Sequence, residues 1–119
     1  MCRKTGRGGT FMDTVARIRP IPIAYPDPND FGTIRRTVLV RVQTADGVVG
    51  WGECIAMWPE ACKAVATIIS EGLAPLVEGQ DATDTAGIWN RMRQHVWWYG
   101  EGGIASMALS GVDMALWDI

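Results

Sequence analysis

The sequence has 119 residues, the length of one ordinary domain, and its 48% apolar and 20% charged residues exclude an intrinsically disordered chain. Lys and Arg number 11 against 13 Asp and Glu, so the net charge of -2 excludes a basic surface for general nucleic-acid binding. No apolar run is long enough to cross a bilayer, which predicts that no membrane is a partner.

The first segment, residues 1–12, is rich in glycine and carries three basic residues. This composition predicts a flexible tail ahead of one folded domain at residues 13–119. The sequence leaves open whether translation starts at Met1 or Met12. No apolar stretch follows the basic residues, as a signal peptide would require, and the three cysteines form no C-x-x-C pair. Reduced thiols and a cytoplasmic location are therefore expected.

The first half of the domain predicts a three-stranded antiparallel meander. Strands are expected at 15–23, 36–44 and 48–54, because β-branched residues alternate with polar ones there. A loop rich in turn formers at 25–32 and a glycine turn at 45–47 join them. Pro20 and Pro22 lack the N–H group, so the first strand is expected to end early or to lie at an edge.

The second half changes to a helical period. A first helix is expected between Ala61 and Leu73, with Pro59 and Glu60 suited to its first turn. A second helix is expected over 84–98, its inner face formed by four residues: Thr85, Trp89, Met92 and Val96. A glycine-rich break at 100–103 ends it.

The last segment, 104–119, predicts a helix that is apolar around most of its circumference. Such a helix is usually buried on nearly all sides. One small sheet and two helices cannot cover it completely. We therefore expect a further body of protein to pack on this helix, and the isolated chain to be a truncated piece of it.

Four sequence motifs point to a family. Gly47 to Glu53 reads G-V-V-G-W-G-E and Ala115 to Ile119 reads A-L-W-D-I, with L-A-P-L-V-E-G and G-I-A-S-M-A-L-S-G-V-D between them. In this order, and with three predicted strands followed by helices, the motifs resemble the N-terminal domain of the mandelate racemase/muconate lactonizing group of the enolase superfamily. The resemblance covers residues 15–119.

The resemblance implies an α+β capping domain, a meander followed by a helical subdomain, whose partner is a C-terminal TIM-like barrel missing from this sequence. In the family the barrel supplies the Mg²⁺ ligands and the acid/base residues, so it implies no catalytic and no metal-binding residue in this chain. The implied reaction is abstraction of the proton next to a carboxylate, with Mg²⁺ stabilising the enediolate, as is general for this superfamily.

The resemblance also implies that the two loops 24–34 and 54–59 close over the barrel mouth and select the substrate. Tyr25 and Trp58 are then candidates to form walls of the pocket, and Asn29 to hydrogen-bond a substrate hydroxyl. The alternative is that Tyr25 and Trp58 only anchor the loops.

The remaining polar and aromatic candidates have structural interpretations. Glu53 is expected to be a hydrogen-bonded structural carboxylate rather than a base, and His95 a surface histidine. Trp97 to Tyr99 are expected at a domain or subunit junction, which predicts a homo-oligomer. Asp113 and Asp118 are expected to tie the last helix to basic groups.

We therefore interpret the chain as the capping domain of a Mg²⁺-dependent enzyme acting on a carboxylic acid, and inactive by itself. The polar first loop (Asp27, Asn29, Asp30, Arg35 and Arg36) favours a sugar-acid dehydratase. A racemase, a cycloisomerase and a stand-alone small-molecule or protein-binding module remain open as alternatives.

Overall fold

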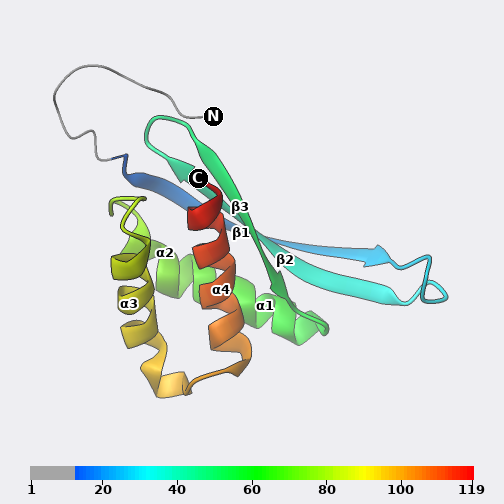
Figure 1. The fold of residues 1–119 in the computed structure, drawn as a ribbon. Coiled ribbons are helices and arrows are strands. Elements are labelled where there is room, and N and C mark those ends of the chain that lie inside the picture. The colour runs from blue at the N-terminus through cyan, green and yellow to red at the C-terminus, as the bar shows by residue number, and fades with distance from the viewer. Residues whose placement is uncertain (1–12) are drawn as a thin grey trace, which may run out of the picture.

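A computed structural model describes residues 13–119, and the predicted tail at 1–12 lies outside the described residues. These residues form two layers, a three-stranded sheet and a layer of helices packed on one of its faces (Figure 1). The predicted α+β class, a meander followed by a helical subdomain, is confirmed.

The sheet is fully antiparallel with the order β1-β2-β3. The strands are β1 (Val15–Pro26), β2 (Ile34–Thr44) and β3 (Val49–Ile55). Residue Ile55 at the end of β3 pairs with Thr37, but β1 and β2 stay paired as far as Pro26 and Ile34. The β1–β2 hairpin therefore extends past β3 as an arm (Figure 1), which contributes to molecular dimensions of 56 × 35 × 18 Å.

Strand β1 is longer than predicted, because its two internal prolines cost it no ladder hydrogen bond. It is an edge strand, with β2 as its one neighbour in the sheet. The N–H of Ile18 points away from β2 and donates to Glu78 Oε1 at 3.0 Å. Backbone direction repeats every two residues along a strand, so the nitrogens of Pro20 and Pro22 also face the free edge. Of the two alternatives, an early end or an edge position, the structure confirms the edge position.

The first predicted helix is a continuous helical segment that is longer than expected. It consists of α1 (Pro59–Thr67), a π-helical stretch η1 (Ile68–Leu73) and α2 (Ala74–Val77). Buried side chains recur along it every three or four residues: Cys62, Val65, Ile69, Leu73 and Val77. The spacing places one stripe of the segment against the sheet.

The other helical elements are α3 (Thr85–Val96), the 3₁₀ turn η2 (Trp97–Tyr99) and α4 (Gly103–Asp118). Asp84 caps α3 by accepting the Gly87 N–H at 3.0 Å. The inner face of α3 differs by one position from the prediction: Ile88 is buried with Met92 and Val96, while Thr85 and Trp89 are partly exposed. None of the helices within residues 13–119 is long and apolar enough to span a membrane.

Helix α4 lies directly on β3, and glycines on both elements permit this close approach (Figure 1). A Cβ atom at Gly52 would stand 1.9 Å from the Gly111 carbonyl oxygen, and one at Gly50 would stand 2.1 Å from the Ala115 carbonyl oxygen. A Cβ at Gly111 would meet Cys54 Sγ at 2.1 Å. The glycines of the G-W-G-E motif are therefore contact positions, at which only glycine lets backbone meet backbone.

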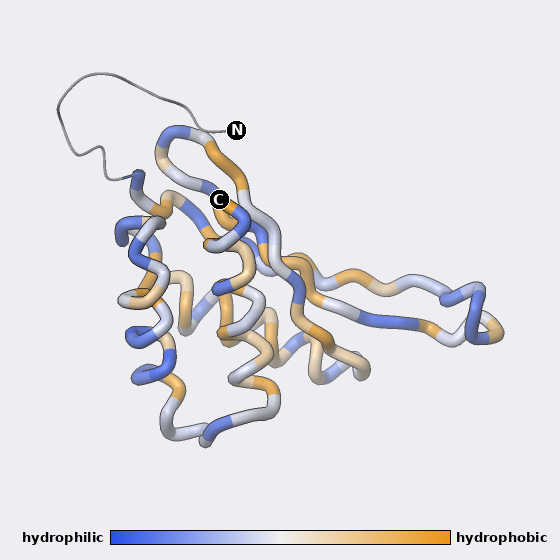
Figure 2. Tube along the Cα trace, viewed as in Figure 1, coloured by the Kyte–Doolittle hydropathy of each residue, from blue (hydrophilic) through white to orange (hydrophobic). Residues whose placement is uncertain are grey.

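On each of the two edge strands of the sheet, one backbone N–H donates to a carboxylate. Glu78 accepts from β1 as described, and on the other edge Asp118 Oδ2 accepts the Trp51 N–H at 2.8 Å. Unpaired N–H groups of edge strands are a template for aggregation, and these two bonds satisfy one donor on each edge. The pattern of hydropathy along the chain (Figure 2) places apolar segments where the two layers meet and polar ones at the hairpin tip.

Candidate functional site

The two candidate loops lie at the same end of the sheet. The β1–β2 turn follows the end of β1, and residues 56–58 follow the end of the antiparallel strand β3, which runs in the same direction as β1 (Figure 1). The structure thus brings both predicted loops to one end, with the hairpin turn farther out along the arm. Across β2, their strands meet in the row Ile23–Thr37–Ile55.

The hairpin turn is held together by its own charged side chains. Arg35 bridges two carboxylates, Asp27 Oδ2 at 3.1 Å and Asp30 Oδ2 at 2.9 Å. Asp27 also accepts the Asn29 N–H at 2.9 Å through its other oxygen. These polar residues favoured a hydroxylated substrate in the sequence analysis. Asp27, Asp30 and Arg35, three of these five residues, already pair with one another within the turn. They therefore give less support to a sugar-acid substrate than the sequence alone suggests.

Tyr25 and Asn29 are both available on the surface of this arm. Tyr25 lies in β1 opposite Arg35 and is half exposed. Asn29 lies in the turn, and its side chain forms no hydrogen bond within residues 13–119. Neither residue lines the cavities described below, so their predicted contact with a substrate stays a prediction.

Phe31 at the tip of the turn was missed by the sequence analysis. It is fully exposed and has a positive φ of 49°, a conformation that costs a non-glycine residue of the order of 1–2 kcal/mol. Gly32 follows with φ 76°. An exposed aromatic ring on a strained backbone is a recognisable signal for a functional contact. A Phe-Gly pair in a loop does not by itself indicate that the phenylalanine has a positive φ.

Trp58 lies in the second loop, immediately before α1. Its carbonyl accepts the Cys62 N–H at 3.0 Å, which fixes the backbone at the helix start, while its side chain is 62% exposed. Met57 beside it is also exposed. The backbone of Trp58 therefore anchors the loop, and its indole ring is free to contact another molecule.

A groove of about 360 Å³ runs between β3 and α4 and begins at this same end. Exposed apolar side chains line it, among them Ile55, Met107 and Met114. Glu53 also lines the groove, and the Thr37 hydroxyl lies 2.9 Å from its Oε1. The expected hydrogen bond of Glu53 is confirmed, and its side chain is exposed.

The groove is part of a larger uncovered face of α4. As the sequence predicts, the sheet and the other helices of residues 13–119 do not cover α4 completely. The helix buries one face against the sheet and α3, and five large apolar side chains are exposed: Ile104, Met107, Met114, Trp117 and Ile119. This exposed apolar face is available for contact with a further body of protein, as the sequence pattern predicts.

The two aspartates of α4 have no basic partner within residues 13–119, contrary to expectation. Asp118 accepts the backbone N–H of Trp51 instead. Asp113 accepts no hydrogen bond, and partial burial raises the pKa of its carboxyl.

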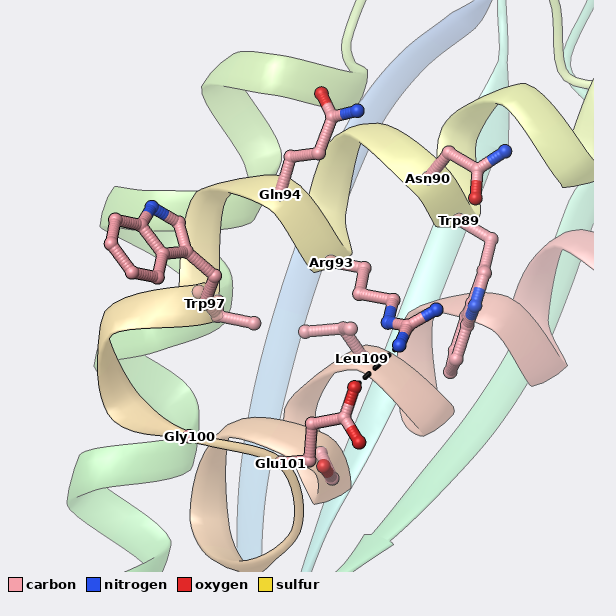
Figure 3. A pocket seen from close by; sticks show the side chains of 10 residues that line it. Trp89, Asn90, Arg93, Gln94, Trp97, Gly100, Glu101 and Leu109 are labelled. Atoms are coloured by element: carbon pink, nitrogen blue, oxygen red, sulfur yellow. Dashed lines mark hydrogen bonds and ion pairs between the residues drawn. The ribbon is translucent and has the colours of Figure 1, made fainter.

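A third surface feature is the cavity of about 650 Å³ between α3 and the start of α4 (Figure 3). Arg93 of α3 and Glu101 form an ion pair across its mouth, and Trp97 flanks it. Trp97 and Trp98 stack with ring centroids 4.4 Å apart, and both are exposed. Their predicted place at a domain or subunit junction stays a prediction. His95 is exposed at the end of α3, as expected.

The buried thiols are not reactive groups in this fold. Cys54 and Cys62 are both free and buried. Burial raises the pKa of Cys54 to about 11, the Gly111 backbone opposes that shift, and the neighbouring Glu53 adds to it. Within residues 13–119 no three His, Cys, Asp or Glu side chains gather as ligands. The described residues therefore do not fit a magnesium centre.

The chain is similar to known proteins both in sequence and in structure. The sequence matches the family described as mandelate racemase/muconate lactonizing enzyme, N-terminal domain, over residues 10–119. It is 38% identical to the D-galactarolactone cycloisomerase of Agrobacterium fabrum over 85 residues, which are 71% of this chain and 21% of that protein. It is 39% identical to the L-rhamnonate dehydratase of Saccharopolyspora erythraea over 83 residues, 70% of this chain and 20% of that protein.

Among solved structures, a racemase from Streptomyces coelicolor A3(2) with bound magnesium matches with a TM-score of 0.77 and 30% identity. The match covers 87% of this chain and 30% of that one. The chain thus spans about a fifth of the curated relatives' length and under a third of this solved chain.

Proposed function

The chain belongs to the mandelate racemase/muconate lactonizing enzyme N-terminal domain family, and from this premise we propose that it is the substrate-capping domain of a longer enzyme. The enzyme removes the proton next to a carboxylate. The observation that carries the proposal is the family match together with the position of both candidate loops at one end of the sheet.

In this proposal the chemistry resides outside the 119 residues. A barrel domain holds Mg²⁺ and the acid/base groups, because residues 13–119 offer no ligand cluster. Mg²⁺ held there would stabilise the negative charge that develops when the proton leaves the substrate. The exposed apolar face of α4 and the β3–α4 groove are the surface against which that domain packs.

The contribution of this chain is to bind and enclose the substrate. The arm and the second loop cover the site, exclude water and orient the substrate. Phe31, Tyr25 and Trp58 supply exposed aromatic surface for this, and the unpaired side chain of Asn29 hydrogen-bonds a hydroxyl. A cytoplasmic location and a homo-oligomeric state are further predictions.

Within this reaction class we favour dehydration of a sugar acid. A relative named as an L-rhamnonate dehydratase supports this choice, and one named as a cycloisomerase keeps cycloisomerisation as the alternative. In the dehydration, the proton leaves C2 of a 2,3-dihydroxy acid and the C3 hydroxyl leaves as water. The resulting enol becomes a 2-keto-3-deoxy acid.

The first test is activity of the longer gene product. It is incubated with Mg²⁺ and a panel of aldonic and aldaric acids, and 2-keto acid formation is measured with semicarbazide. We expect 2-keto acid from at least one acid sugar and none from the 119-residue chain alone. Isomerisation of a lactone without loss of water would select the cycloisomerase, and inactivity on all carboxylic acids would reject the proposal.

The second test concerns the loops. In the active protein, Trp58→Ala and Phe31→Ala are expected to raise KM roughly fivefold or more, because each removes an aromatic substrate contact. Trp98→Ala, which removes another exposed ring outside both loops, is the control and is expected to leave KM unchanged. Equal effects of all three substitutions would show that the loops do not contact the substrate.

A further inference from the structure

A shallow pocket between α3 and α4 lies apart from both loops and from the β3–α4 groove. Its volume is about 290 Å³, and six residues line it: Thr85, Ala86, Trp89, Asn90, Asp113 and Trp117. Asp113 is the one charged residue of this lining. The pocket therefore combines a single negative charge with aromatic and small polar surface.

The Asp113 carboxylate is incompletely solvated and has no compensating partner. It accepts no hydrogen bond and forms no ion pair within residues 13–119. Its neighbour Val112 is fully buried, so the helix holds Asp113 at the edge of the core. A carboxylate that has lost water without gaining a partner is stabilised by any cation that reaches it.

Two tryptophans line the pocket together with this carboxylate. Trp89 projects from α3 toward α4 (Figure 3), and Trp117 stands one helical turn after Asp113 on α4. The faces of tryptophan rings attract guanidinium and ammonium groups. Neither Lys nor Arg lines the pocket, so the cation has to come from outside it.

We propose that this pocket receives the guanidinium or ammonium group of an arginine or lysine side chain from the part of the enzyme outside these 119 residues. The inference rests on the proposed function, because the matched relatives are several times longer than this chain. The cationic side chain neutralises Asp113, lies against the two indole rings, and fixes α3 and α4 to the rest of the protein.

The test uses the chain itself with ethylguanidinium as the probe and N-ethylacetamide as the neutral control. Binding is followed through the tryptophan indole N–H signals in NMR spectra at constant ionic strength. We expect ethylguanidinium to shift the Trp89 and Trp117 signals saturably and the neutral probe to leave them in place. Asp113→Asn is expected to weaken binding about tenfold, since it removes a charge-assisted hydrogen bond. Trp117→Leu, which alters a largely exposed ring, is expected to weaken binding severalfold.

The control variant is Glu71→Gln, which removes the same charge from an exposed helical position and is expected to leave binding unchanged. Equal binding by the parent and Asp113→Asn, or shifts spread over all tryptophans, would overturn the proposal. A concentration-dependent dimer that Asp113→Asn abolishes would assign the cation to a second copy and also overturn it. Because the readout is cation binding, its failure is distinct from failure to find enzymatic activity.

Discussion

Cys54 is the residue at which burial has the clearest consequence for pH dependence. Its thiol lies under Gly111 and has a folded-state pKa of about 11, compared with 9.0 without burial. Between these values the unfolded state loses the proton and the folded state keeps it, so stability falls as the pH rises. We expect a loss on the order of 2–3 kcal/mol between pH 9 and 11, measured by urea unfolding.

Cys54→Ala is the comparison for this pH effect, because it removes the ionisable group with little change of volume. Its unfolding free energy is expected to vary less over the same pH interval. Alkylation at pH 8 followed by peptide mapping should also find Cys54 protected in the folded chain. Parallel pH profiles of the two proteins would contradict the assignment.

Gly52 determines how closely α4 approaches the sheet. Gly52→Ala would place a Cβ 1.9 Å from the Gly111 carbonyl oxygen, and neither backbone can move without separating β3 from α4. We expect destabilisation of roughly 3 kcal/mol, at the upper end of overpacking effects, measured by urea unfolding. Gly72→Ala is the control, since its Cβ would have ordinary contact with His95 Nε2 at 3.4 Å. Equal stability of both variants would show that the helix and the sheet are not in backbone contact.

At the scale of elements, one side-chain hydrogen bond joins α4 to the free edge of the sheet. Asp118 of α4 accepts the Trp51 N–H of the β3 edge. The hydrogen bond between the two elements accounts for the aspartate at this position.

Two substitutions separate the hydrogen bond from the charge. Asp118→Asn keeps an acceptor oxygen and removes the charge, so we expect stability close to that of the parent chain. Asp118→Leu removes the acceptor, and we expect a loss of about 1 kcal/mol together with faster hydrogen exchange at the Trp51 amide. Faster exchange in both variants, or in neither, would contradict this role.

Most of the secondary structure could be predicted from the sequence. The strands, the helices and their order follow from periodicity and turn residues, and α4 was identified as a helix with surplus apolar surface. The continuation of β1 through Pro20 and Pro22 was not predictable, because it depends on which way the edge nitrogens face. The same holds for Asp118 and Asp113, whose partners or lack of them are fixed by tertiary packing.

For the candidate site, the location of the loops could be predicted from the sequence, whereas the ion pairs and the backbone conformation of their residues could not. Both loops lie at one end of the sheet, as a meander requires. The charges of the turn gave a misleading cue, because sequence cannot show that Arg35 already pairs with Asp27 and Asp30. Phe31 was overlooked because backbone strain arises only once the turn has closed.

At the scale of the whole molecule, the uncovered apolar surface is the dominant property. Ile55 is 64% exposed, Met107 40% and Met114 47%, and they share one groove between β3 and α4. Contiguous apolar surface of this kind favours contact with another protein surface. The isolated chain is therefore expected to bind hydrophobic dyes and to self-associate, as seen by fluorescence and sedimentation.

Charge placed on this surface should remove the effect without unfolding the chain. The variant Met107→Lys/Met114→Lys is expected to bind dye at least severalfold more weakly and to sediment as a monomer, with an unchanged circular dichroism spectrum. Leu116→Lys is the contrasting variant, because Leu116 is only 3% exposed and a charge there disrupts the core. If the parent chain proves dye-silent and monomeric, the exposed face of α4 requires no partner, and the interpretation of this surface as a domain interface fails.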